Sequence, residues 1–156
     1  MAITDLSALV GTWEGAGAGA YPTISGFGYV ETATFTAVPG KPFLAYEQRT
    51  RADDDGRPLH RETGYLRPGA DGAVEWSLAQ PTGHAELSVG TFAVTAGGGV
   101  LDVTTTAVLR SPSALEVSQL RRRYTVDGDV LRYELDMAAV GQPLQRHLVA
   151  ELRRQA

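Results

Sequence analysis

Short runs of β-branched and aromatic residues recur at roughly ten-residue intervals along this chain, and residues that favour turns separate them. The strongest turn signals are Pro39-Gly40, Asp53-Asp54-Asp55-Gly56, Arg67-Pro68-Gly69, Gly97-Gly98-Gly99 and Asp127-Gly128. Between them we expect strands over residues 29–37, 43–50, 59–66, 74–80, 85–91, 101–107, 131–137 and 144–152, with a first strand that begins near residue 9 and another that ends at 126. Connections this short leave no room for crossover helices, so the sheet must be antiparallel.

The number of strands predicts an all-β fold, a roughly ten-stranded antiparallel up-and-down β-barrel that is wide enough inside to hold a ligand. A closed sandwich is the alternative that the pattern leaves open. The length of 156 residues fits a single domain over residues 1–156. Only the segment from Thr4 to Leu9 has the pattern of a helix, a short N-terminal turn that the Thr4 hydroxyl could cap.

Glycine occupies every second position from Gly15 to Gly19, in what we expect to be the first strand. On an alternating strand these glycines share one face, which therefore carries no side chains. Two interpretations are open. The glycines relieve crowding in a sharply bent barrel strand, or they leave room beside the backbone for a flat ligand.

Composition excludes several classes of function. The chain has no cysteine, so disulfides, thiolate metal sites and cysteine nucleophiles are absent. The formal net charge of −4 argues against nucleic-acid binding, which needs a basic surface. Arg121, Arg122 and Arg123 form the densest basic run, and we expect them at solvated positions. Because the chain shows neither a membrane-spanning apolar run nor an export signal, we expect no membrane association and a cytoplasmic location.

The three histidines are the natural candidates for acid–base chemistry or metal ligation. His84 follows a Pro-Thr-Gly turn, which favours an exposed loop position, while His60 could face either a cavity or solvent. Strict alternation in the last strand places His147 opposite Leu148 and Ala150, on the solvent side. A bulge after Pro143 would reverse that assignment. The sequence shows no zinc motif, nucleophile elbow or dinucleotide-binding fingerprint.

Several blocks of the sequence together resemble the nitrobindin family. Gly11-Thr12-Trp13-Glu14-Gly15-Ala16-Gly17 fits its G-x-W-x-G-x-G motif, and Tyr21-Pro22-Thr23-Ile24 follows at the family's spacing. The later blocks at 40–42, 60–68, 79–83 and 143–152 agree in order, so the resemblance covers essentially the whole chain. A Gly-x-Trp near the N-terminus also occurs in lipocalins and fatty-acid-binding proteins, which share the barrel architecture but lack the other blocks.

The resemblance implies one haem b per chain, held as ferric iron by a single histidine at one mouth of the barrel. His147 matches that histidine, and the residues that match the surrounding cavity are Pro22, Thr23, Ile24, Leu59, His60, Gln80 and Met137. The haem propionates have no assigned partner, although Arg67 or Arg122 could serve. Whether two chains pair as a homodimer is left open.

The activity that the resemblance implies is the isomerisation of peroxynitrite to nitrate at a five-coordinate ferric iron, together with reversible binding of nitric oxide. Two alternatives remain open at this point. One is a non-catalytic barrel that carries a fatty acid or another apolar ligand. The other is a haem-based nitric oxide sensor.

Overall fold

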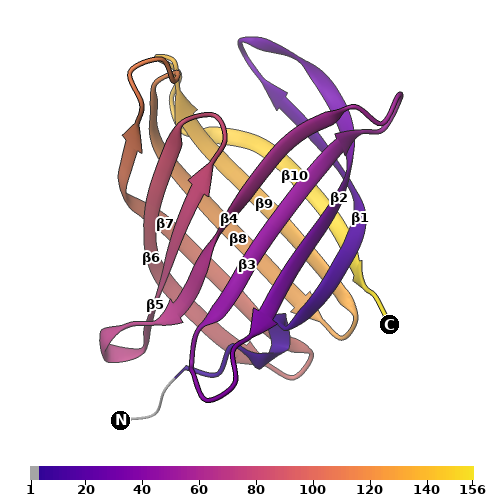
Figure 1. Cartoon of the computed structure of the whole chain (residues 1–156), viewed down its shortest axis with the longest axis vertical. Helices are drawn as coiled ribbons and strands as arrows, with labels where there is room; N and C mark the ends of the chain where they lie inside the picture. The colour runs from indigo at the N-terminus through magenta and orange to yellow at the C-terminus, as the bar shows by residue number, and fades with distance from the viewer. Residues whose placement is uncertain (1–3) are drawn as a thin grey trace.

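Each strand pairs with its neighbours in sequence, and the first strand closes on the last (Figure 1). The structure is a computed structural model that describes residues 4–156. The strands are β1 (Gly11–Tyr21), β2 (Ile24–Ala37), β3 (Leu44–Ala52), β4 (Pro58–Pro68), β5 (Ala73–Gln80), β6 (His84–Thr95), β7 (Gly98–Arg110), β8 (Val117–Asp127), β9 (Val130–Ala139) and β10 (Gln145–Arg154). Two short 3-10 helices, η1 (Ser7–Leu9) and η2 (Ala70–Gly72), complete the described elements. The predicted all-β antiparallel barrel is confirmed, and the sandwich alternative is wrong.

The N-terminal turn is present, but the Thr4 hydroxyl does not cap it: the N-cap residue is Leu6, and no side chain makes a capping hydrogen bond. The side chain of Asp5 accepts a hydrogen bond from the backbone N–H of Ser7 at 2.9 Å. The Thr4 hydroxyl instead points toward the carbonyl oxygen of Gly72, 3.4 Å away. Within residues 4–156, no helix has the length and apolar character needed to cross a membrane.

The connections between strands gather at the two ends of the barrel (Figure 1). The β1–β2, β3–β4, β5–β6, β7–β8 and β9–β10 connections lie at one end, which we call the open end. The remaining connections, η1 and the C-terminus lie at the other end, which we call the closed end. Since strands run up and down in order, residues far apart in sequence meet at the open end.

The closed end is filled by apolar side chains. Trp13 and Leu9 are fully buried there, and the indole N–H of Trp13 donates to the carbonyl oxygen of Leu9 at 2.9 Å. The guanidinium of Arg154 lies 4.2 Å from the Trp13 ring centre, so its charge covers the aromatic face. η1 therefore plugs this end, which leaves the open end as the place for a ligand.

The glycine face of β1 points into the barrel and is occupied by neighbouring groups. A Cβ on Gly17 would lie 2.4 Å from Cζ of Tyr29, and one on Gly19 would lie 2.3 Å from Cζ of Phe27. A Cβ on Gly15 would lie 2.1 Å from the backbone oxygen of Glu151 in β10. The glycines thus admit aromatic rings and the next strand. The crowding interpretation is correct, and the expectation of an open face for a flat ligand is wrong.

Candidate functional site

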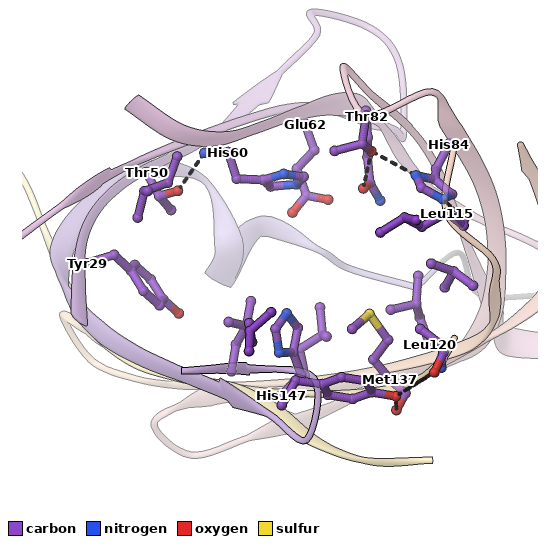
Figure 2. A pocket seen from close by; sticks show the side chains of 18 of the residues that line it. Tyr29, Thr50, His60, Glu62, Thr82, His84, Leu115, Leu120, Met137 and His147 are labelled. Carbon is purple, nitrogen blue, oxygen red and sulfur yellow. Dashed lines mark hydrogen bonds between the residues drawn. The ribbon is translucent and has the colours of Figure 1, made fainter. Parts of the chain in front are cut away.

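A cavity of about 600 Å³ opens at the open end of the barrel, a size within the usual range for small-ligand sites. Its wall is largely apolar, and it extends down to polar side chains midway along the barrel. Residues from all ten strands and from the intervening turns reach it, as Figure 2 shows for part of the lining. All three histidines of the chain line this one cavity.

The structure brings together most of the residues predicted to surround a cofactor. Those that line the cavity are Thr23, Ile24, Leu59, His60, Gln80, Met137 and His147. Pro22 is exposed in the β1–β2 turn and is not among the lining residues. The β1–β2 hairpin supplies Thr23 and Ile24 at the rim, where Ile24 is 51% exposed.

His147 enters the cavity because β10 contains a bulge. Arg146 pairs with Asp136 and Leu148 pairs with Leu135, so the register with β9 shifts across His147. The extra residue lets His147 and Leu148 both line the cavity. The strict alternation that placed His147 on the solvent side is therefore wrong, and the bulge considered as the alternative is present.

One nitrogen of His147 is already occupied. Its Nδ1 lies 3.0 Å from the carbonyl oxygen of Ala20 in β1. A carbonyl oxygen only accepts, so Nδ1 carries the proton and the neutral ring keeps its lone pair on Nε2. Within residues 4–156, no hydrogen bond engages Nε2. Figure 2 shows the ring standing in the cavity from the wall opposite His60.

The ring of His147 is also fixed by aromatic neighbours. The ring of Tyr21 packs edge-on against it, with centres 5.4 Å apart, and the ring of Phe27 lies at 6.5 Å. The hydroxyl of Tyr21 accepts the N–H of Ala139 at 2.9 Å and donates to the carbonyl oxygen of Met137 at 3.0 Å. Tyr21 thus ties the β1–β2 hairpin to β9 behind His147. Sequence reasoning assigned it no such role, although it stands in the quoted motif.

His60 faces the same cavity from β4 (Figure 2). Burial lowers the pKa of His60 below its ordinary value, so the ring is neutral at pH 7. Its backbone N–H donates to the Thr50 hydroxyl at 3.1 Å. Within the described chain, no hydrogen bond fixes its ring nitrogens. His60 therefore lacks the carbonyl partner that sets the tautomer of His147.

His84 is not the exposed loop residue that the sequence predicts. It is the first residue of β6, half-buried, and lines the cavity. Its Nδ1 lies 2.8 Å from the Thr82 hydroxyl, and its Nε2 lies 2.7 Å from the carbonyl oxygen of Leu115. Both ring nitrogens are engaged, so His84 has no lone pair free to bind a ligand. It holds the β5–β6 turn to the β7–β8 connection.

Beneath the cavity the barrel interior contains a charged layer, which we define as Glu31, Gln48, Glu62, Glu86 and Arg122; all are at most 5% exposed. The guanidinium of Arg122 donates from Nη1 and Nη2 to the two Glu62 oxygens at 3.1 and 2.9 Å. Its Nε donates to Glu86 at 3.0 Å. Glu86 also accepts the side-chain N–H of Gln80 at 2.6 Å, which links the layer to the cavity wall.

The burial of Arg122 overturns the expectation that the basic run lies at solvated positions. Alternation does divide the run, but Arg122 is 2% exposed and faces the interior, while Arg121 and Arg123 face solvent. Because two carboxylates already hold Arg122, it is not a free cation for a propionate. Arg67 lies exposed near the far end of β4 and does not line the cavity.

These features define a class of protein. A barrel closed at one end, with an apolar cavity at the other and an imidazole whose free nitrogen faces that cavity, is a small-ligand-binding β-barrel. In His147 one ring nitrogen is hydrogen-bonded to a backbone carbonyl oxygen and the other is free. This arrangement is typical of histidines that bind a metal through the free nitrogen.

Comparisons with known proteins give the family. The profile described as "THAP4-like, heme-binding beta-barrel domain" matches residues 2–154. The chain belongs to this family, which confirms the resemblance seen in its sequence.

Among the similar sequences are proteins named Peroxynitrite isomerase 1. One, from Mycolicibacterium paratuberculosis, is 54% identical, and the alignment covers 98% of this chain and 94% of the relative. Another, from Mycobacterium tuberculosis, is 53% identical, and the alignment covers 99% of this chain and 95% of the relative. The crystal structure of Rv2717c from M. tuberculosis superposes with a TM-score of 0.93 at 52% identity, over 97% of this chain and 95% of that one.

Proposed function

We propose that this chain is a haem-dependent peroxynitrite isomerase that binds one ferric haem b through His147. The observation that carries the proposal is the state of the His147 ring, with Nδ1 engaged by Ala20 and Nε2 free toward the cavity. The family is a haem-binding one, and relatives at 52–54% identity are named peroxynitrite isomerases. We also propose that the protein binds nitric oxide reversibly and works in the cytoplasm.

The residues of the cavity fit a flat, largely apolar group with one metal. Ile24, Phe27 and Leu148 supply apolar surface near His147, and Met137 and Leu59 extend it along the wall. Of the three histidines, His84 has both nitrogens engaged, and His60 lacks a partner that would fix its ring. His147 is therefore the residue that would hold the iron through its Nε2.

When bound, a ferric haem would supply a Lewis-acidic iron with an open position for peroxynitrite or nitric oxide. The protein's part is to hold and orient it. The Ala20 carbonyl oxygen accepts the Nδ1 proton of His147, which fixes the tautomer and the orientation of the ring and leaves Nε2 to bind the iron. Tyr21 and Phe27 keep the ring from turning. His60, neutral at pH 7, adds no charge to the opposite wall.

The proposal is tested by the decay of peroxynitrite in stopped flow, with nitrate yield measured on the haem-loaded protein. We expect His147→Ala to abolish both the accelerated decay and the histidine-ligated Soret spectrum. The matched control is His84→Ala, which removes an imidazole from the same cavity but one with no free nitrogen; it should keep the haem spectrum. An unchanged decay in His147→Ala would refute the proposal.

A further inference from the structure

A chain of three hydrogen-bonded groups lies at the base of the cavity. The hydroxyls of Tyr29 and Tyr133 are 2.7 Å apart, and the Tyr133 hydroxyl donates to Glu31 at 2.5 Å. Since Tyr133 gives its proton to Glu31, it must accept the proton of Tyr29. All three residues are at most 4% exposed, and both tyrosines line the cavity (Tyr29 in Figure 2).

The chain continues as stacked aromatic rings. The rings of Tyr133 and Tyr124 lie 4.9 Å apart at an interplanar angle of 17°. Tyr124 in turn packs against Trp76, with ring centres 5.4 Å apart. Nothing in the binding of a haem by His147 uses Tyr133, Tyr29 or Glu31, so this cluster calls for its own explanation.

A phenol gives up an electron readily only when its proton can leave at the same time, and a hydrogen-bonded carboxylate is a suitable base. Of the tyrosines that line the cavity, Tyr133 has such a carboxylate within 2.5 Å. The hydroxyl of Tyr29 remains to donate a hydrogen bond to the oxidised oxygen. The stacked ring of Tyr124 can share the electron deficiency.

We propose that Tyr133 is a redox-active tyrosine that reduces nitrogen dioxide in the cavity, with Glu31 taking the phenolic proton. Nitrogen dioxide is the one-electron oxidant formed when the O–O bond of peroxynitrite breaks and the fragments fail to recombine. The Tyr133 phenol loses one electron to nitrogen dioxide, which becomes nitrite, and its O–H bond breaks as Glu31 takes the proton. The resulting phenoxyl radical couples at a ring carbon with a second nitrogen dioxide and gives 3-nitrotyrosine.

The source of the oxidant rests on the proposed function, but the reactivity of Tyr133 does not. Tyr133 would remove nitrogen dioxide that escapes recombination, before it leaves the protein. Tyr65, which is 54% exposed on the outer face of β4, serves as an internal reference for attack from solution.

The acceptor must be ionised, so the reaction depends on pH. The titratable and charged groups that face Glu31 are Tyr29 on its own strand, Tyr46 of β3, Glu62 of β4, Arg122 and Tyr124 of β8, and Tyr133 of β9. Gln48 of β3 also faces it. Burial raises the pKa of Glu31 to about 7, against the hydrogen bonds from Tyr133 and Gln48 that lower it. Oxidation of Tyr133 should therefore become faster as the pH rises through 7.

The first experiment needs no haem activity. Nitrogen dioxide is generated by pulse radiolysis of nitrite in the presence of the full chain, with and without bound haem. The phenoxyl absorption is followed in time, and nitrated tyrosines are located by peptide mapping. We expect Tyr133 to be nitrated ahead of Tyr65. Nitration that follows solvent exposure, with Tyr65 first, would overturn the proposal.

Two variants examine the proton acceptor. Glu31→Gln should slow phenoxyl formation about a hundredfold, the lower end of what a positioned base contributes. Tyr124→Phe is the matched control: it removes a buried hydroxyl beside Tyr133 and leaves Glu31 in place, so Tyr133 should still react. An unchanged rate in Glu31→Gln would overturn the role of Glu31. If a variant fails to fold, the map of the unaltered protein still decides for or against Tyr133.

A second experiment separates this inference from the proposed function. Haem-loaded protein is mixed with peroxynitrite, and samples frozen at short times are examined by electron paramagnetic resonance for a tyrosyl radical that Tyr133→Phe removes. Such a radical supports the inference. Reaction of Tyr133 under radiolysis, with neither haem binding nor nitrate formation, would instead refute the proposed function and leave the redox-active tyrosine in place.

Discussion

Arg122→Met removes the guanidinium that lies between the carboxylates of Glu62 and Glu86. Arg122 makes three hydrogen bonds to them at 2.9–3.1 Å, and the side chains are 3%, 5% and 0% exposed. Leaving buried carboxylates without their cation costs about 3–5 kcal/mol. That is a large part of the roughly 5–15 kcal/mol that stabilises a typical domain. In a chain of this size it corresponds to a fall in melting temperature of about 10 °C.

The assay is urea unfolding at pH 7, and the matched control is Arg121, the residue that precedes Arg122 in sequence. Arg121 also makes two hydrogen bonds to a carboxylate, that of Asp102, but on the outer face where its side chain is 46% exposed. Arg121→Met should cost less than about 1 kcal/mol, as solvent-exposed ion pairs do. Equal losses in the two variants would refute the reasoning.

Two further results are expected. Gly17→Ala should strongly destabilise the barrel, because its Cβ would meet the Tyr29 ring at 2.4 Å. Gly26→Ala should be tolerated, because its Cβ would make only an ordinary contact at 3.7 Å. Thermal unfolding compares the two variants, and equal melting temperatures would contradict the packing described. The pKa of Glu31 lies at about 7 rather than 4.5 because of burial, so its protonation stabilises the fold below pH 4.5 and that contribution is lost as the pH rises through 7. Between pH 4.5 and pH 7 the free energy of unfolding of the unaltered protein should fall by about 3 kcal/mol more than that of Glu31→Gln. Urea titrations at several pH values measure both, and parallel curves of unfolding free energy against pH would exclude the raised pKa.

Signals between residues close together in sequence determine the order and the ends of the strands, which is why the sequence predicts the barrel well. Turn residues such as Asp127-Gly128 fix where strands end, and alternation places Val74, Trp76 and Leu78 inside. The sequence pattern predicts the start of this strand at residue 29, whereas β2 begins at Ile24. Glycines at 26 and 28 lower the strand propensity of that segment, but pairing with β1 through Gly19 and Ala18 holds it in the sheet.

The site depends on features that alternation does not encode. The bulge at His147 moves a single side chain to the other face, and only pairing with β9 defines it. Arg122 lies in the interior because the carboxylates of Glu62 in β4 and Glu86 in β6 meet it across the barrel. These residues are 60 and 36 positions away from Arg122 in sequence. His84 is held by Leu115, 31 positions away. The family resemblance identified His147 correctly as a cavity residue where periodicity alone did not.

The most direct test of the central claim is the replacement of the proposed iron ligand by an exogenous one. His147→Gly leaves space beside the Ala20 carbonyl oxygen and removes the imidazole, so haem added to this variant should lack the histidine-ligated spectrum. Added imidazole should restore the spectrum of the haem-loaded unaltered protein, and nitrate formation from peroxynitrite should return with it. A variant that binds haem with an unchanged spectrum, before any imidazole is added, would contradict the assignment of His147.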